Sequence, residues 1–116
     1  MHSFDINITG KQIPVTPTLA LVNALEDQFS MLPDLLKQLQ ERRLPLKTQI
    51  AIITTTALQN GTELKEDDFE QQLAEQGATG ISRDCIKIIS VLVAGIQALQ
   101  HFTGSGDGLG KPMAKA

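Results

Sequence analysis

The 116-residue chain has no tryptophan, no tyrosine and four phenylalanines, so aliphatic side chains must build its core. Aromatic rings stack nucleic-acid bases and anchor many sugar and cofactor sites, and their scarcity argues against sites of these kinds. Cys85 is the single cysteine, which excludes an intrachain disulfide and a thiolate metal cluster. Because Cys85 lies in the most apolar stretch of the chain, we expect a buried and unreactive thiol.

Positive charge is also scarce, with ten Lys and Arg residues against 13 Asp and Glu and a net charge of −3. Such a chain has no overall positive field to attract a phosphate backbone, so we expect no nucleic-acid partner. The one basic doublet, Arg42-Arg43, falls at the expected end of a helix, where cations favour the helix dipole. A small nucleic-acid-binding regulator is therefore the least favoured of the binding functions.

Long hydrophobic runs are absent as well. The longest apolar stretch, residues 85–99, is interrupted by Lys87, Ser90 and Gln97, whereas a membrane span needs about 20 mostly apolar residues. The first residues lack the basic and apolar regions of a signal peptide. We therefore expect no membrane partner and a location inside the cell.

Residues that could carry catalysis are few and dispersed. His2 and His101 lie far apart near the two ends, and carboxylates cluster only at Glu26-Asp27 and Glu66–Asp68. Both acidic clusters have the pattern of solvated surface, and the second also fits the start of a helix. The glycine-rich residues 104–110 lack the preceding strand and following helix of a phosphate loop. The sequence predicts no enzyme, no catalytic residue, no metal and no cofactor.

Residues 4–15 have the pattern of a short hairpin. Phe4, Ile6 and Ile8 alternate with polar residues, which is the period of a half-buried strand. Gly10-Lys11 is expected to form the turn, and Pro14 marks the second strand as an edge strand because it lacks a backbone N–H.

The rest of the chain predicts a compact bundle of about five helices over residues 17–102, giving a mainly α (α+β) fold. Residues 1–103 form the single expected domain, and the glycine-rich residues 104–116 a flexible tail. Thr16-Pro17 is expected to start the first helix and Ser82 the last. The expected helices are 17–29, 30–43, 46–59 with Ile50, Ile53 and Leu58 facing inward, 65–76 ended by Gly77, and 82–102.

The last expected helix is apolar on nearly every side. Such a helix either occupies the centre of a core or keeps an uncovered face for a partner, and both can hold together. We prefer the core interpretation for most of its residues. The candidates for contact with a partner or with another copy of the chain are Ile88, Val91, Leu92 and Leu99.

This order of elements resembles that of the tail assembly chaperones of long-tailed phages and gene transfer agents. The resemblance covers roughly residues 4–102 and consists of loose helix-boundary patterns without a catalytic residue. After the hairpin, the matching segments are Thr16-Pro17-Thr18-Leu19-Ala20-Leu21, Leu32-Pro33-Asp34-Leu35-Leu36, Leu44-Pro45-Leu46, Asn60-Gly61 and Leu73-Ala74-Glu75-Gln76-Gly77.

The resemblance implies a viral protein of the host cytoplasm that binds the tape measure protein, keeps it soluble for tail tube assembly and is absent from the finished virion. Further partners that it implies are the tail tube protein, a longer product made by translational frameshifting near Leu109-Gly110-Lys111, and other copies of the chain. The alternative is a small structural tail or tail-completion protein that stays in the virion.

Overall fold

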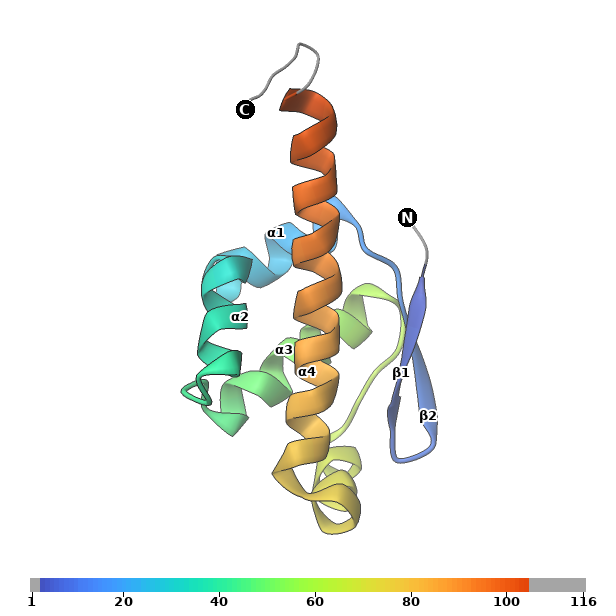
Figure 1. Cartoon of the computed structure of the whole chain (residues 1–116). Coiled ribbons are helices and arrows are strands. Elements are labelled where there is room, and N and C mark those ends of the chain that lie inside the picture. The colour runs from blue at the N-terminus through green and yellow to red at the C-terminus, as the bar shows by residue number, and fades with distance from the viewer. Residues whose placement is uncertain (1–2, 105–116) are drawn as a thin grey trace.

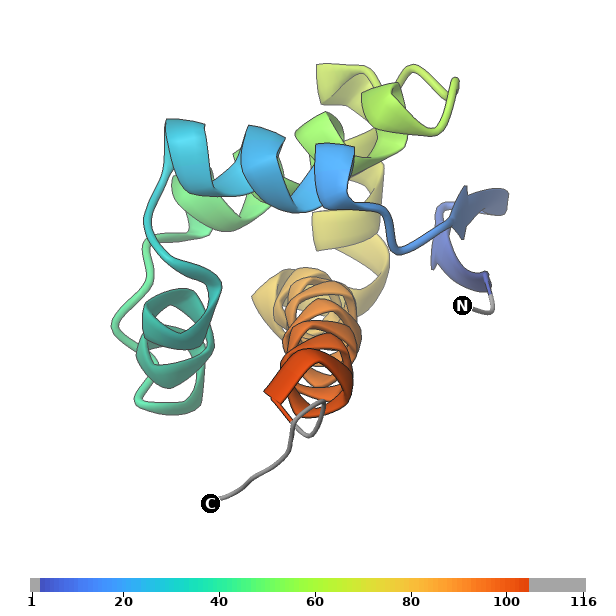
Figure 2. The ribbon, with the colours of Figure 1, turned by 90° about the horizontal axis from the view of Figure 1, so that it is seen from above.

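The computed structural model describes residues 3–104, and the side chains of residues 3–95; within this part a hairpin precedes four helices (Figure 1). Seen from above, α2 and the hairpin lie on opposite sides of α4, and α3 packs against α4 between them (Figure 2). The expected mainly α fold with an N-terminal hairpin is confirmed. The elements are β1 (Phe4–Ile8), β2 (Lys11–Val15), α1 (Leu19–Gln28), α2 (Leu32–Gln40), α3 (Leu46–Gln59) and α4 (Glu66–Gly104).

The hairpin is an antiparallel pair closed by a two-residue turn. Its register pairs Phe4 with Val15 and Ile8 with Lys11, so the turn is Thr9-Gly10 and not the expected Gly10-Lys11. Both turn residues have positive φ, 50° and 85°, which is the type I′ geometry that matches the twist of the strands. The buried face consists of Ile6, Ile8, Ile13 and Val15.

The first helix begins two residues later than expected. Thr18 is its N-cap, because the Thr18 hydroxyl accepts a hydrogen bond from the backbone N–H of Leu21 at 3.1 Å. Thr16-Pro17 is therefore an extended lead-in, and its proline is buried. The correct cap is the threonine whose side chain satisfies one of the free N–H groups of the first turn.

Helix α3 has the predicted bounds, Leu46–Gln59, and is followed by a left-handed residue, Gly61, at φ 83°. The N–H of Thr62 donates to the carbonyl of Ala57 at 2.9 Å, which completes a Schellman cap. The expected inward position of Leu58 was wrong: Leu58 is 58% exposed, and Ile52 is buried instead. Asn60-Gly61 therefore indicates where the helix ends, but it does not indicate which side of the helix faces the core.

The two helices expected at 65–76 and 82–102 fall within one element, α4, in which a sharp kink at Gly77 separates two helical segments. Counted by element, the described chain has four helices rather than about five. Gly77 absorbs the change of direction at φ 72° and ψ −174°, and residue 78 is already helical. Ser82 is consequently inside the helix and is not its N-cap. Its hydroxyl donates instead to Oε1 of Gln49 on α3 at 2.7 Å.

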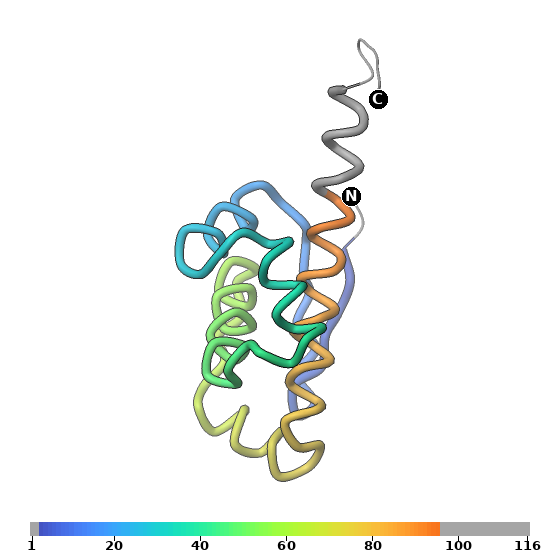
Figure 3. Tube along the Cα trace, turned by 60° about the vertical axis from the view of Figure 1, so that its left-hand side comes forward, coloured from blue at the N-terminus to red at the C-terminus, as the bar shows by residue number. Residues whose placement is uncertain are grey.

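One buried cluster joins all six elements, and α3 packs against both α4 and β2. In Figure 3 the shorter helices α1, α2 and α3 gather beside the long helix α4. Its members on α4 are Phe69, Ile81, Cys85, Ile88, Ile89, Leu92 and Val93. Except for Gly104, the expected flexible tail lies outside the described residues.

Candidate binding groove

An open groove of about 540 Å³ lies where the end of α2, the start of α3 and the middle of α4 meet. Four aliphatic side chains line it: Leu46 and Ile86 are partly exposed, whereas Leu39 and Leu44 form its floor and are buried, at 5% and 8% exposure. Its polar lining consists of Arg42, Gln49, Thr79, Ser82 and Arg83, with Ala78 beside them.

The α2–α3 turn shapes one wall of the groove. The N–H of Arg42 donates to the carbonyl of Leu39 at 3.1 Å, and that of Arg43 to the carbonyl of Gln38 at 2.8 Å, which is a Schellman cap. Arg42 occupies the position usually taken by glycine, with φ 58°. A left-handed residue with a side chain costs roughly 1–2 kcal/mol. The turn holds the Arg42 side chain at the rim in spite of this cost.

Two polar contacts fix the opposite wall. The Gln49 side chain is buried, and its Nε2 donates to the carbonyl of Leu44 at 2.9 Å. Its Oε1 accepts the hydrogen bond from Ser82, so one amide ties the α2–α3 turn to α3 and α4. Because both ends of this amide are satisfied, the wall is held in one arrangement.

Arg83 bridges the kink that precedes the groove. Its guanidinium donates to Oε1 of Gln76 at 2.7 Å, and Gln72 donates to the same oxygen at 2.9 Å. Oε1 of Gln72 in turn accepts from the backbone N–H of Thr9 at the hairpin turn, at 3.1 Å. Gly80 is required beside this network, because a Cβ there would lie 2.7 Å from Gln76 Oε1. The network therefore ties the groove to the hairpin.

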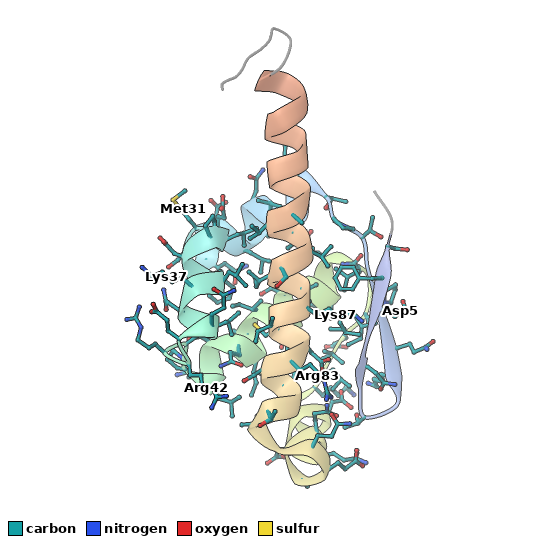
Figure 4. All side chains as sticks on the ribbon, viewed as in Figure 1. Asp5, Met31, Lys37, Arg42, Arg83 and Lys87 are labelled. Atoms are coloured by element: carbon teal, nitrogen blue, oxygen red, sulfur yellow. The ribbon has the colours of Figure 1, made fainter. Side chains whose placement is uncertain are left out.

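The corner around the groove is basic in a chain that is acidic overall. Arg42 and Arg83 line the groove and are exposed, and the exposed Lys47 follows the lining residue Leu46 on α3. Figure 4 places Arg42 at the α2–α3 turn and Arg83 on α4, whereas the exposed Lys37 lies on the outer side of α2. Arg43 is also exposed but pairs with Glu41 at 2.7 Å. In sequence, Arg42-Arg43 is explained by the helix dipole, and only the fold brings Arg42 to a groove.

The residues predicted to contact a partner occupy different environments. Ile88 and Leu92 are 0% and 1% exposed, so they belong to the core and not to an accessible surface. Val91 is partly exposed, and the side chain of Leu99 lies outside those that the structure describes. The correction follows from packing: α2, α3 and the hairpin cover this part of α4, which confirms the core interpretation for Ile88 and Leu92.

The titratable groups singled out in the sequence have structural explanations. Cys85 is fully buried, and burial raises the pKa of its thiol to about 12, in agreement with an unreactive cysteine. Asp68 accepts a hydrogen bond from the Lys65 backbone N–H at 2.9 Å, which lowers the pKa of its carboxyl and fits a helix start. His2 and the His101 side chain lie outside what is described.

Asp84 is a buried carboxylate that the sequence analysis missed. The residue is 7% exposed, and its Oδ2 is buried with no hydrogen-bond partner among the residues that the structure describes. Burial raises the pKa of this carboxyl, while the nearby charges of Arg83 and Lys87 oppose the rise. Asp84 falls beside Arg83 in the first turn of the helix expected to start at Ser82, where charged residues are ordinary, so no sequence pattern distinguished it.

We expect Asp84→Asn to be more stable than the parent protein at pH 7, by about 1 kcal/mol, because a buried ionised group is removed. Because the pKa of the Asp84 carboxyl is raised, the native state holds this proton more tightly than the unfolded state does. The ionised carboxylate therefore destabilises the native state increasingly as the pH rises above the unfolded-state pKa. The stability difference should therefore shrink as pH falls from 7 towards 4, as measured by urea unfolding followed by circular dichroism. A difference that stays constant with pH would contradict this account.

Comparisons of the chain with models of known protein families, with curated proteins and with solved structures found no match. Among the described residues, no three His, Cys, Asp or Glu side chains gather as metal ligands. None of the described helices is long and apolar enough to cross a membrane. A functional proposal for this chain must therefore start from its own groove and its sequence.

Proposed function

We propose that this protein is a phage tail assembly chaperone that binds the tape measure protein and keeps it soluble until the tail tube forms around it. The observation that supports the proposal is the open groove with an aliphatic lining at the meeting point of α2, α3 and α4. A free tape measure helix would expose an apolar stripe, and a concave aliphatic surface on a small bundle can cover part of it.

The size of the groove suits a contact that can be reversed. Its volume of about 540 Å³ has room for a few aliphatic side chains of a partner helix. Each fully buried aliphatic side chain contributes about 1.5–3 kcal/mol before the costs of association. One groove would therefore bind weakly. Many copies could cover a long helical partner through weak, independent contacts and could be displaced one at a time.

The site of action that we propose is the cytoplasm of the host, with no copy retained in the finished virion. Mass spectrometry of purified virions tests this point. A chaperone is expected to be missing from the particles, whereas the alternative, a structural tail or tail-completion protein, would be found there in a fixed number of copies.

Co-expression with the tape measure protein tests the binding role. We expect the tape measure protein to be soluble and to co-purify with this chain, and to aggregate without it. Thr79→Trp should abolish co-purification, because the exposed Thr79 lines the groove and an indole would fill it.

The matched control is Asn23→Trp, which places the same ring on an exposed position of α1 away from the groove lining. It should co-purify normally, and circular dichroism should show that both variants are folded. A tape measure protein that is equally insoluble with and without the chain would refute the proposed function. Normal binding by Thr79→Trp would refute the groove as its site.

A further inference from the structure

We propose that the groove selects a partner helix whose apolar stripe is bordered by carboxylates, so that its ligand is an acidic amphipathic segment. The inference rests on the proposed function only in taking the groove as the binding site. It adds the charge of the partner, which neither the resemblance nor the aliphatic lining specifies.

Positive charge is concentrated in one segment of an otherwise acidic chain. Residues 37–47 contain four cations and one carboxylate, a formal charge of +3, whereas the whole chain carries −3. The remainder therefore carries −6. Within this basic segment, Arg42 lines the groove and Lys47 follows the lining residue Leu46, while Arg83 lines the groove from α4.

The cations at the rim are available to a partner. Arg43 is engaged by Glu41, and Arg83 by the neutral Gln76. Within the described part of the chain, Arg42 and Lys47 have no ion pair, and both are exposed. A partner helix seated over the partly exposed Leu46 and Ile86 would bring its flanking side chains near Arg42 and Lys47.

Two other occupants fit the groove less well. Residues 105–116 carry Lys111 and Lys115 against the single acid Asp107, so their net charge has the same sign as the rim. In a second copy, the acidic start of α4 has the right charge, but its exposed residues Glu66, Asp67, Glu70 and Gln71 are polar. They would leave the aliphatic lining unfilled. An acidic helix with its own apolar stripe would fill the aliphatic lining and would also bring carboxylates to the cations at the rim.

Two fluorescently labelled 18-residue helical peptides test the inference against the full chain. Both carry the same leucine stripe, with Glu at the bordering positions in one and Lys in the other. Fluorescence anisotropy at 50 mM NaCl should show the Glu peptide binding about tenfold more tightly, the effect expected of several exposed ion pairs. The advantage should largely disappear at 500 mM NaCl, because salt screens exposed charges.

Charge-reversal variants identify the groups responsible. Lys47→Glu should weaken binding of the Glu peptide several-fold, and the double variant Arg42→Glu/Lys47→Glu should reverse the preference between the peptides. Lys65→Glu is the matched control, since Lys65 is also an exposed lysine near a helix start but lies away from the groove lining. It should bind like the parent protein.

Equal affinity for the two peptides, or binding of neither, would overturn the inference. Salt-sensitive self-association that Lys47→Glu abolishes would also overturn it, by making a second copy the occupant. The proposed function can be judged separately: if Arg42→Glu/Lys47→Glu still co-purifies with the tape measure protein, charge selection is wrong while the chaperone role stands.

Discussion

Leu92→Asp is expected to leave the chain unfolded at neutral pH. The side chain is 1% exposed in the middle of the core, where α2 and α3 pack on α4. Removing a buried leucine costs about 2–5 kcal/mol, and an unpaired buried carboxylate adds several more. A domain of this size has only about 5–15 kcal/mol of stability in total. Circular dichroism and urea unfolding would show the loss of helix and of a cooperative transition.

The neighbouring residue provides the control. Val91 is partly exposed on the same helix, so Val91→Asp should stay folded with a loss of about 1 kcal/mol or less. A cooperative transition in Leu92→Asp close to that of the parent would show that Leu92 is outside the core. Because Leu92→Asp also removes the fold, a loss of binding in that variant says nothing about an interface, whereas Val91→Asp tests this face of α4 directly.

The parts of the fold that could be predicted from the sequence are those with a local cause. Alternation of Phe4, Ile6 and Ile8 requires only that one face of a strand be buried. The bounds of α3 follow from Pro45 before it and Asn60-Gly61 after it. In each case the signal and the structure that it produces lie within a few residues.

The rotation of a helix about its axis was predicted less well. Leu58 was placed inward although it is exposed, and Ile88 and Leu92 were offered as interface residues although they are buried. A helix that is apolar on nearly all sides has no preferred face in its own sequence. Which side is covered depends on neighbours that the local pattern does not contain.

The groove could not be predicted, because its residues come from two distant segments, 39–49 and 78–86. Leu39 and Leu44 look like ordinary core residues in sequence, and Arg42 looks like a helix-end cation. Only the packing of α2 and α3 on α4 makes them one surface. The same holds for Asp84, whose burial is a tertiary property.

Gly77→Ala is expected to destabilise the protein by about 3 kcal/mol, although alanine favours a helix interior over glycine by about 1 kcal/mol. At φ 72° and ψ −174°, Gly77 is in a region that residues with a Cβ avoid. A Cβ at this position would meet nothing within 4 Å, so the cost is conformational and repacking of neighbours cannot relieve it.

Gly61→Ala is the comparison, because Gly61 also has positive φ and open space around its Cβ but sits at an ordinary left-handed helix end. Its substitution should cost about 1 kcal/mol, as in other caps of this kind. Urea unfolding of the two variants would separate the effects. If Gly77→Ala were as stable as the parent, the kink would not be fixed by its backbone conformation.

The α4 wall of the groove starts at Ala78, directly after the kink, so Gly77→Ala should also weaken binding of the acidic peptide, whereas Gly61→Ala should not.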